Sequence, residues 1–470
     1  MPFNSFAFLL FFSIVLAATL LLPRRAQNLC LLAASYCFYA AWDWRFLGLL
    51  LFSTLVAWAT ARALAASEAA PRRRAIVTAG IVANLSLLGC FKYAGFFAAS
   101  LRELLGLFGV HVSDWAQGVV LPVGISFYTF QTLGYAIDVY RRQIAPTRSL
   151  FDFALFVAFF PLLLAGPIER AANLLPQILR PRRISWEKIG TGSWLALWGL
   201  FKKVVIADNL WPLVDSVYGQ GAQPTGAEVL VATYAFGAAI YCDFSGYTDI
   251  ARGTARLLGF ELMLNFDLPY FARSVQDFWR RWHISLSSWL RDYLYVPLGG
   301  NRTHPIRNIW LTMLLCGLWH GAGWNFVAFG AYHGALLVLY RASLGWRQRL
   351  LAFRSPGARR AWTLASVAIT FHAVVLGWIF FRAESLGRAL ELWGALASAP
   401  GLGLVAEWAP RLALLLLPLA LVDGAQWLSG DLEPVQRLRW PARTLLYATL
   451  VAGIVLAGED FGEEFLYFRF

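Results

Sequence analysis

Charged side chains are scarce in this sequence. Only 14% of its 470 residues are Asp, Glu, Lys or Arg, whereas 59% are hydrophobic, and the mean hydropathy is +0.57. A soluble domain averages about 25% charged residues, and a disordered chain combines low hydrophobicity with many charges. The composition excludes both classes and predicts an integral membrane protein, surrounded by the lipid bilayer.

Several signatures of common catalytic and binding sites are also missing. The sequence has no GxSxG nucleophile elbow, no GxxxxGK[ST] phosphate loop and no HExxH motif. It has five cysteines, all in apolar stretches and without a CxxC pair: Cys30, Cys37, Cys90, Cys242 and Cys316. This spacing indicates buried thiols rather than disulfides or a metal centre. We therefore expect no metal and no bound cofactor.

The basic residues occur in short groups at the ends of apolar runs. The formal net charge is +13, and the groups are Arg24–Arg25, Arg72–Arg74, Arg141–Arg142, Arg180–Arg183 and Lys202–Lys203. Such groups are typical of loops that set membrane orientation, and they do not form the single basic patch of a nucleic-acid-binding protein. We expect no nucleic-acid partner, an amino terminus outside the cell, and the first two groups in the cytoplasm.

Apolar runs recur from residues 3–22 to residues 442–457. At about 20 residues per crossing, the chain has room for roughly ten to twelve spans. Several runs are too short to cross, and we expect these to be re-entrant or interfacial helices. The run 3–22 lacks a cleavage site, which favours a retained first span. Without repeats or long linkers, the sequence predicts an all-α, multi-span membrane protein with a single domain over residues 1–470.

One segment, residues 260–305, is unusually rich in charged and aromatic side chains. Read as one helix over about 274–295, it has a polar stripe of Gln276, Arg280, His283 and Ser287 and an aromatic stripe of Phe278, Trp282, Trp289 and Tyr293. The helix could lie in the head-group plane, or its polar stripe could line a water-filled chamber in the membrane. The residues alone leave both interpretations open.

The most specific candidate for chemistry is His320. Its neighbours Gly317, Gly321 and Gly323 allow a backbone or a substrate to approach closely, and imidazole can take a proton near neutral pH. A core histidine bonded to a carbonyl fits the pattern equally well, and His333 fits helix packing better than chemistry.

Several of these motifs resemble the membrane-bound O-acyltransferase (MBOAT) family, and within it the bacterial branch that O-acetylates exopolysaccharides. The matching segments are Phe91–Tyr93, Leu121–Tyr128, Ala165–Ile168, Asp243–Asp249, Asp277–Ser287 with Trp289–Tyr293, Gly317–Gly321 and the aromatic tail Phe465–Phe470. The resemblance implies a helical bundle around a central funnel or tunnel, with a catalytic core over about residues 117–341.

The resemblance also implies roles for individual residues. His320 falls on the family's catalytic histidine and would act as general base, and His283 falls on the second polar position of the site. The residues expected to bind substrate are Asp277, Trp279, Arg280, Ser287, Trp319 and Asn325. No protein nucleophile is needed, because a thioester donor is already activated.

The implied substrates are a cytoplasmic acyl thioester, most simply acetyl-coenzyme A, and a hydroxyl of an exopolysaccharide such as alginate. Transfer would be direct or through an exported or membrane-anchored hydrolase-like partner, at the bacterial inner membrane. Two alternatives stay open. One is D-alanine transfer to teichoic acid, and the other is a proton-coupled transporter or flippase with Asp243, Asp249 and His320 as a relay. For the two aspartates, a structural salt bridge is at least as compatible.

Overall fold

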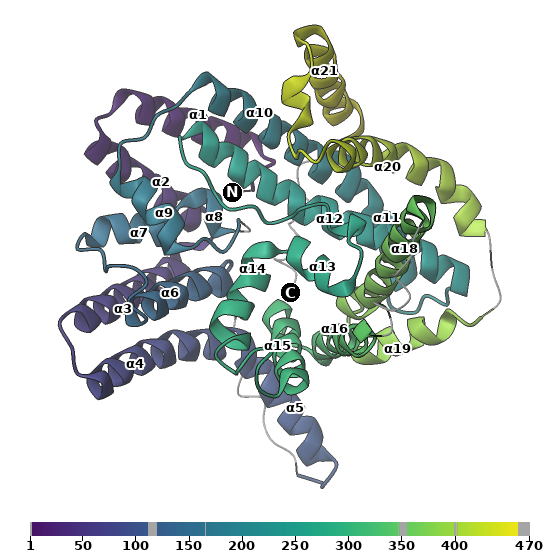
Figure 1. Cartoon of the computed structure of the whole chain (residues 1–470), viewed down its shortest axis with the longest axis horizontal. Helices are drawn as coiled ribbons and strands as arrows, with labels where there is room; N and C mark the ends of the chain where they lie inside the picture. Colours follow the sequence, from purple (N-terminus) through teal and green to yellow (C-terminus); the bar gives the residue numbers. More distant parts are fainter. Residues whose placement is uncertain are drawn as a thin grey trace. The chain divides into compact units, whose positions relative to one another are not determined.

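The computed structural model describes residues 2–110, 120–164, 166–345, 347, 355–398, 401 and 403–458, and these residues form helices and no strand (Figure 1). The expected all-α fold is confirmed. The chain separates into two compact units, Met1–Ser193 with Ala251–Met263, and Trp194–Ile250 with Leu264–Phe470. The aromatic tail Phe465–Phe470 and Ala165 of the matching segments lie outside the described residues.

The first unit is built from the amino-terminal helices. They are α1 (Phe6–Leu21), α2 (Arg24–Asp43), α3 (Leu47–Ala65), α4 (Ala70–Leu88), α5 (Ala94–Gly106), α6 (Ile125–Tyr140), α7 (Leu150–Ala158), α8 (Phe160–Leu163), α9 (Ala171–Leu179) and the start of α10 (Trp186–Phe201). The short helices η1 (Trp44–Phe46) and η2 (Gly89–Tyr93) connect some of them.

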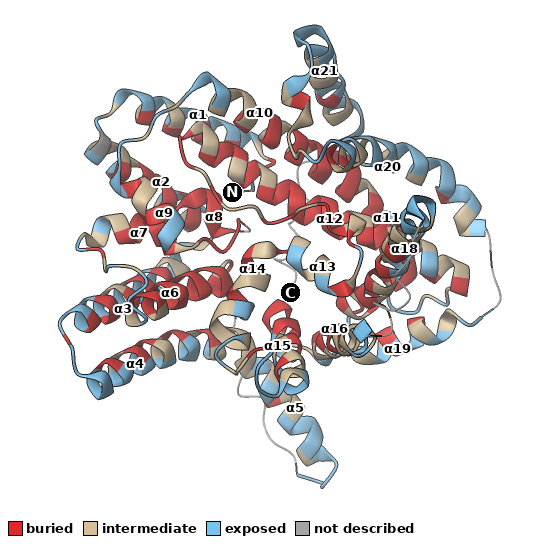
Figure 2. Cartoon of the chain, viewed as in Figure 1, coloured by how far each residue is buried: buried red, intermediate tan, exposed pale blue. Residues whose placement is uncertain are grey.

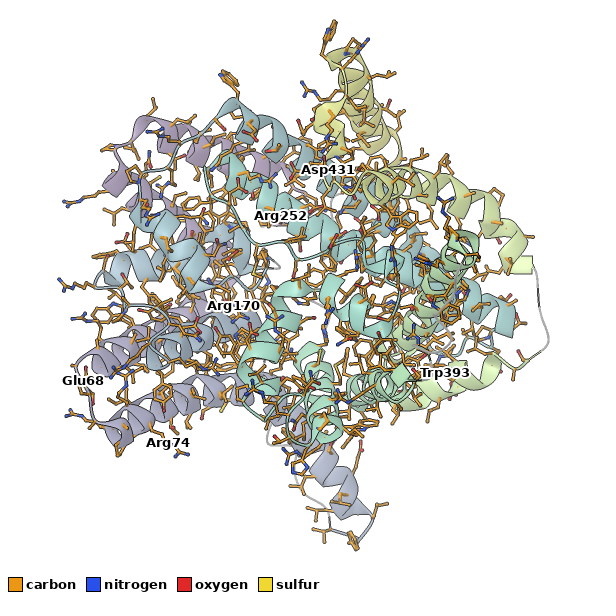
Figure 3. All side chains as sticks on the ribbon, in the orientation of Figure 1. Glu68, Arg74, Arg170, Arg252, Trp393 and Asp431 are labelled. Carbon is orange, nitrogen blue, oxygen red and sulfur yellow. The ribbon has the colours of Figure 1, made fainter. Side chains whose placement is uncertain are left out.

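Polar side chains join α3, α4 and α6 inside the first unit. The Ser53 hydroxyl lies 2.5 Å from Asn84 Oδ1 and 3.1 Å from Thr132 Oγ1. Arg73, near the start of α4, donates to the carbonyls of Leu64 at 2.6 Å and Tyr140 at 2.9 Å. These carbonyls lie in the last turns of α3 and α6, where backbone carbonyls have no N–H partner within the helix. By contrast, Glu68 and Arg74 are exposed near the turn between α3 and α4 (Figure 3).

The second unit contains the remaining helices. After the end of α10 they are η3 (Lys202–Ala207), α11 (Asp208–Tyr218), α12 (Gly226–Leu257, whose last residues belong to the first unit), η4 (Pro269–Phe271), α13 (Val275–Arg281), α14 (Ile284–Leu290), η5 (Arg291–Tyr295), α15 (Pro305–His320), α16 (Trp324–Ala342), α18 (Pro356–Arg382), α19 (Leu386–Ala395), α20 (Gly403–Ser429), η6 (Pro434–Arg437) and α21 (Trp440–Ala457).

Six segments of the described chain are long and apolar enough to cross a membrane. They are Arg25–Ala65, Ala70–Gly106, Gly226–Leu257, Pro356–Arg382, Gly403–Ser429 and Trp440–Ala457. In Figure 2, α20 and α21 are largely exposed, although they are apolar. Exposed apolar helices of this length require a lipid environment. The total of ten to twelve spans stays a prediction.

The prediction of one helix over about 274–295 is wrong. The segment is divided into α13, α14 and η5, and His283 between the first two has a left-handed backbone with φ 45° and ψ 54°. Two backbone hydrogen bonds replace helical ones at this break: Asp267 N donates to Arg281 O at 3.0 Å, and Ile284 N donates to Asn265 O at 2.9 Å. Backbone hydrogen bonds to the segment before α13 therefore interrupt the helix.

Candidate active site

His320 is the last residue of α15, in a hairpin formed by α15 and α16. Glycines bring the two helices close together. A Cβ atom on Gly317 would lie 2.1 Å from the Phe326 carbonyl oxygen, and one on Gly330 would lie 2.3 Å from the Met313 carbonyl oxygen. Neither position therefore tolerates a side chain without movement of the backbone. The close packing fixes the end of α15, where His320 is only 3% exposed.

His283 is fully buried at the break between α13 and α14. Its Nδ1 atom lies 3.1 Å from Oδ1 of Asn265. The edge of the ring meets Phe244 of α12 at a centroid distance of 4.7 Å, and Trp319 of α15 lies at 5.5 Å. Aromatic rings, the Asn265 amide and the Ser285 hydroxyl, which lies 3.4 Å from Nδ1, therefore surround this imidazole.

The two imidazole rings face the same small region of the second unit. Their centroids are 6.3 Å apart, and His320 also packs against Phe381 at 5.2 Å and Phe329 at 5.9 Å. A hydroxyl group placed between two such rings would be shielded from bulk water. In such a setting a base acts on a bound hydroxyl without competition from solvent.

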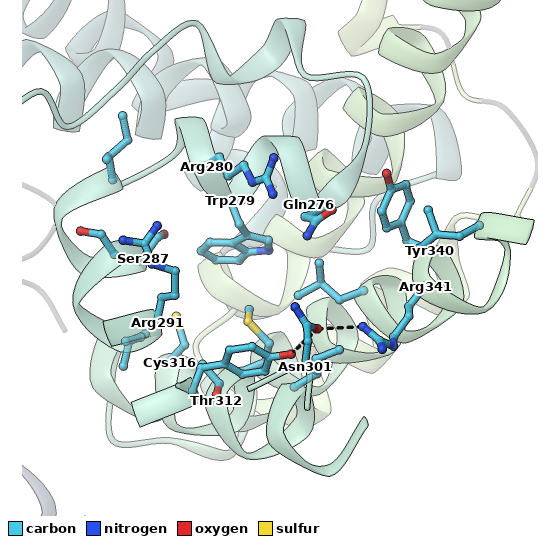
Figure 4. Close-up of a pocket in the computed structure, with 18 residues that line it drawn as sticks. Gln276, Trp279, Arg280, Ser287, Arg291, Asn301, Thr312, Cys316, Tyr340 and Arg341 are labelled. Carbon is cyan, nitrogen blue, oxygen red and sulfur yellow. Dashed lines mark hydrogen bonds between the residues drawn. The ribbon is translucent and has the colours of Figure 1, made fainter. Parts of the chain in front are cut away.

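The second unit contains a cavity of about 620 Å³ (Figure 4). It is lined by Gln276, Trp279, Arg280, Ile284, Ser287, Ser288, Leu290, Arg291, Tyr295, Asn301, Ile309, Thr312, Met313, Cys316, Leu337, Tyr340, Arg341 and Leu344. These residues belong to α13, α14, η5, α15, α16 and the segments that follow η5 and α16.

Two helix faces lead from the cavity toward the histidines. On α15, Ile309, Thr312, Met313 and Cys316 line the cavity, and His320 follows Cys316 by four residues on the same face. On α14 and η5, the lining residues Ile284, Ser287, Ser288 and Arg291 begin immediately after His283. Neither histidine lines the cavity itself: its lining includes Ile284, next to His283, and Cys316, about one helical turn before His320.

The lining of the cavity is cationic. Arg280, Arg291 and Arg341 belong to it, and none of the lining residues in the described part of the chain is acidic. Arg341 donates to Asn301 Oδ1 at 2.8 Å and Tyr295 donates to the same oxygen at 3.0 Å (Figure 4). Arg291 is paired with Asp292 at 2.7 Å, outside the lining. The cavity therefore suits an anionic ligand.

Comparison with known proteins agrees with this architecture. A family model described as "MBOAT, membrane-bound O-acyltransferase family" matches residues 140–381. The chain is 43% identical over 403 residues to a probable alginate O-acetylase AlgI of Azotobacter vinelandii, covering 85% of this chain and 78% of the relative. This chain belongs to the membrane-bound O-acyltransferase family. It is a membrane protein and an O-acyltransferase.

Two further relatives are named for different acyl-transfer reactions. A peptidoglycan O-acetyltransferase of Helicobacter pylori is 35% identical over 406 residues, covering 80% of this chain and 75% of the relative. A teichoic acid D-alanyltransferase of Streptococcus thermophilus is 30% identical over 328 residues, covering 63% of this chain and 77% of the relative.

The structure of the O-acyltransferase divides the expected substrate-binding residues into two groups. Trp279, Arg280 and Ser287 line the cavity, and Trp319 packs against both histidines, 5.5 Å from the ring of His283 and 5.1 Å from that of His320. These positions are compatible with the roles implied by the resemblance.

Asp277 and Asn325 make structural contacts outside the cavity. Asp277 accepts a hydrogen bond from Arg281 Nε at 2.9 Å and one from the backbone N–H of Arg273 at 3.0 Å. Asn325 donates to the carbonyl of Ala383 at 2.8 Å. Their roles in substrate binding stay predictions.

The expected polar stripe is only partly present. Gln276, Arg280 and Ser287 line the cavity, but His283 turns into the protein interior because of the break at its own backbone. Sequence reasoning also did not single out Asn265, Arg291, Asn301 and Arg341. Asn265, Arg291 and Asn301 lie in the unusual segment 260–305, whereas Arg341 carried no local signal.

The two aspartates proposed for a relay form buried ion pairs with lysines of η3. Lys203 Nζ lies 2.7 Å from Asp208 and 2.8 Å from Asp243. Lys202 Nζ lies 2.7 Å from Asp249 and 2.8 Å from the Ser245 hydroxyl. These contacts join η3 to α11 and α12 and give the aspartates a structural role.

Among the described residues, no group of three or more His, Cys, Asp or Glu side chains is arranged to hold a metal ion. The polar groups found at the site in the described part of the chain are the two imidazoles and the polar side chains that line the cavity.

Proposed function

We propose that this enzyme transfers an acetyl group from a thioester donor to hydroxyls of an exopolysaccharide of the alginate type, with His320 as general base. The substrate class rests on two relatives whose names specify acetyl transfer to a polysaccharide, at 43% and 35% identity. The observation that carries the mechanism is the cavity whose two helix faces continue to His283 and His320.

The charge of the cavity favours the donor as its occupant. Coenzyme A and carrier-bound thioesters contain phosphate groups, which guanidinium groups bind well. Arg280, Arg291 and Arg341 line the cavity, whereas neither histidine does. A thioester whose phosphates contact these arginines would extend its acyl group toward His320.

The distribution of charge in the neighbouring loops favours a cytoplasmic opening. Arg302 and Arg347 lie in the segments that follow η5 and α16, and Arg359 and Arg360 lie in the first turns of the candidate span α18. The loop 321–323, which follows His320, has no charged residue. Arginine in short loops marks the cytoplasmic side, where the thioester donors are made. Because the donors are cytoplasmic, we propose that the protein lies in the bacterial inner membrane.

The reaction needs a base and alignment of two substrates. The acceptor oxygen attacks the carbonyl carbon of the thioester, and His320 takes the hydroxyl proton as the new C–O bond forms. The C–S bond then breaks, and the proton moves from His320 to the thiolate that leaves. The negative end of the α15 dipole lies at His320 and stabilises the transient imidazolium. The acceptor is the polymer itself or an exported hydrolase-like partner that passes the group on.

D-Alanine transfer to teichoic acid is the second candidate, because a D-alanyltransferase is 30% identical over 63% of this chain. The two candidates differ in the acyl group and not in the catalytic histidine. A donor assay therefore separates them.

The test uses the full chain in proteoliposomes, with isotope-labelled acetyl-coenzyme A or a D-alanyl thioester and alginate oligosaccharides. Released thiol and acylated product are both followed, the product by mass. We expect thiol release and product with the acetyl donor. Thiol release with the D-alanyl donor alone would favour the second candidate, and no release from any thioester would contradict the proposal.

A further inference from the structure

Asn265 lies in the segment between α12 and α13 and is fully buried. Its side-chain oxygen Oδ1 is the common acceptor of a small network. The backbone N–H of Ser285 donates to it at 3.2 Å and the Ser285 hydroxyl at 2.8 Å, and His283 Nδ1 lies 3.1 Å away. On the other side of the amide, Asn265 Nδ2 donates to Thr248 Oγ1 at 3.4 Å.

The backbone donor fixes the orientation of the Asn265 amide. Oxygen and nitrogen of an amide are normally distinguished by their hydrogen-bond partners. The N–H of Ser285 can only donate, so the amide atom facing it must be the oxygen. The reversed amide would place an NH₂ group against this N–H and leave both donors unsatisfied in the interior.

This orientation determines the proton position on His283. An amide oxygen accepts hydrogen bonds and cannot donate, so His283 Nδ1 must carry a hydrogen to bond it. In a neutral imidazole the other nitrogen then holds the lone pair. We infer that Asn265 is a positioning residue for acyl transfer, which holds His283 in the Nδ1–H tautomer and makes Nε2 its accepting nitrogen. This inference rests on the proposed function, in which His283 acts beside His320.

The tautomer matters because His283 stays neutral. Burial lowers the pKa of the His283 imidazole to about 3, and the residue lies outside the six candidate spans. A neutral Nδ1–H imidazole can accept a hydrogen bond at Nε2 from a hydroxyl, but it cannot donate one there. His283 therefore orients the acceptor hydroxyl, and it does not stabilise the negative oxygen that forms on the thioester carbonyl.

The same segment also holds the backbone of His283. Ile284 N donates to Asn265 O at 2.9 Å, and Asp267 N donates to Arg281 O at 3.0 Å. A non-glycine residue in the left-handed region persists only when its surroundings enforce it. The side chain and the backbone of Asn265 thus act on the same histidine, as outer-shell groups do for histidine ligands in metal sites.

The direct test is nitrogen NMR of the full chain in lipid, labelled with ¹⁵N in its histidine rings. The His283 signals are assigned by their loss in His283→Gln. We expect a protonated Nδ1 and a bare Nε2 for His283 at neutral pH. A protonated Nε2 with a bare Nδ1 would overturn the inference.

Variants of Asn265 provide the second test. Asn265→Asp keeps an accepting oxygen toward His283 Nδ1, so the tautomer should be retained and kcat should fall less than about tenfold. Asn265→Leu removes the acceptor, and kcat should fall about 10- to 100-fold with little change in the KM of the donor. Asn84→Leu makes the same change at a buried asparagine of the first unit, and kcat per folded molecule should stay near that of the parent protein.

The outcomes are distinguishable from failure of the proposed function. If Asn265→Leu does not fold, the tautomer measured in the parent protein and in Asn265→Asp still tests the inference. Unchanged kcat in folded Asn265→Leu would contradict the inference even if His320 proves essential. Full activity of His320→Ala with a confirmed Nδ1–H tautomer would instead contradict the proposed base.

Discussion

The imidazole rings of His283 and His320 lie 6.3 Å apart, although one follows a seven-residue helix and the other ends α15. Both side chains are buried, and Trp319 contacts both rings. In the proposed mechanism the acceptor hydroxyl approaches both rings. This pair is the geometric basis of the proposed acyl transfer.

Replacement of His283 should reduce turnover without unfolding the protein. His283→Ala removes the group that orients the acceptor, and we expect kcat to fall by about 10²-fold, at the lower limit of acid–base effects. The measurement is kcat in lipid, with thermal unfolding as a check on the fold. His372→Ala is a suitable control, because His372 is exposed on α18. Equal activity of the two variants would remove His283 from the mechanism.

The cavity arginines should act on donor binding more than on chemistry. Arg280→Gln and Arg341→Gln each remove a cation that faces the cavity. We expect the KM of a phosphate-containing thioester to rise about 3- to 30-fold, since one hydrogen bond to a charged group contributes about 1.5–3 kcal/mol and exposure reduces it. An unchanged kcat would show that these arginines bind the donor equally well in the ground state and in the transition state.

The control for the arginine variants is Arg302→Gln, which changes an exposed arginine that does not line the cavity. Its KM should stay within about twofold of the parent value. A similar rise in KM for all three variants would indicate a general electrostatic effect, and the cavity would lose its assignment as the donor site.

The buried ion pairs should be essential for stability. Lys203→Met leaves Asp208 and Asp243 without their shared cation, and breaking a buried pair costs about 3–5 kcal/mol. We expect a clear fall in Tm, measured in detergent. Arg142→Met disrupts an exposed pair with Glu68, which should change stability by less than about 1 kcal/mol. If both variants unfold at the parent temperature, the lysine does not stabilise the unit.

His333 should prove to be a packing residue. It is fully buried on α16 against Phe329 at 4.7 Å and Trp279 at 5.1 Å, and no hydrogen-bond partner of its ring nitrogens is found among the described residues. His333→Phe preserves ring shape and removes the polar atoms, so stability and turnover should stay near parent values. His333→Ala should destabilise the protein by about 3–5 kcal/mol through the cavity it creates. A loss of turnover in folded His333→Phe would assign it to the chemistry.

The sequence identified His320 because its signal is local: a histidine among glycines at the end of an apolar run. The break at His283 could not be found in the same way. Its aromatic and polar periodicity is helical, and the backbone pairing with Asn265 and Asp267 that interrupts it is tertiary. Tertiary contacts often override local preference.

The cavity was only partly predictable for a related reason. Arg280 and Ser287 belong to the motif that the sequence singled out, whereas Arg341 comes from the end of α16 and Asn301 from the loop after η5. Nothing in the spacing along the chain indicates that these side chains meet. Only the tertiary packing of the helices and of the loop after η5 brings these side chains around one cavity.

The most direct measurement of the central claim is acyl transfer by purified His320→Ala in proteoliposomes, with thioester donor and polysaccharide acceptor and with product followed by mass. General-base catalysis contributes about 10²–10⁴ in rate, which corresponds to about 3–5 kcal/mol of barrier. We predict a loss of this size in a protein that still inserts and unfolds at the parent temperature. His320→Asn should not restore activity, because an amide does not take up a proton near neutral pH. Near-normal turnover in folded His320→Ala would contradict the account.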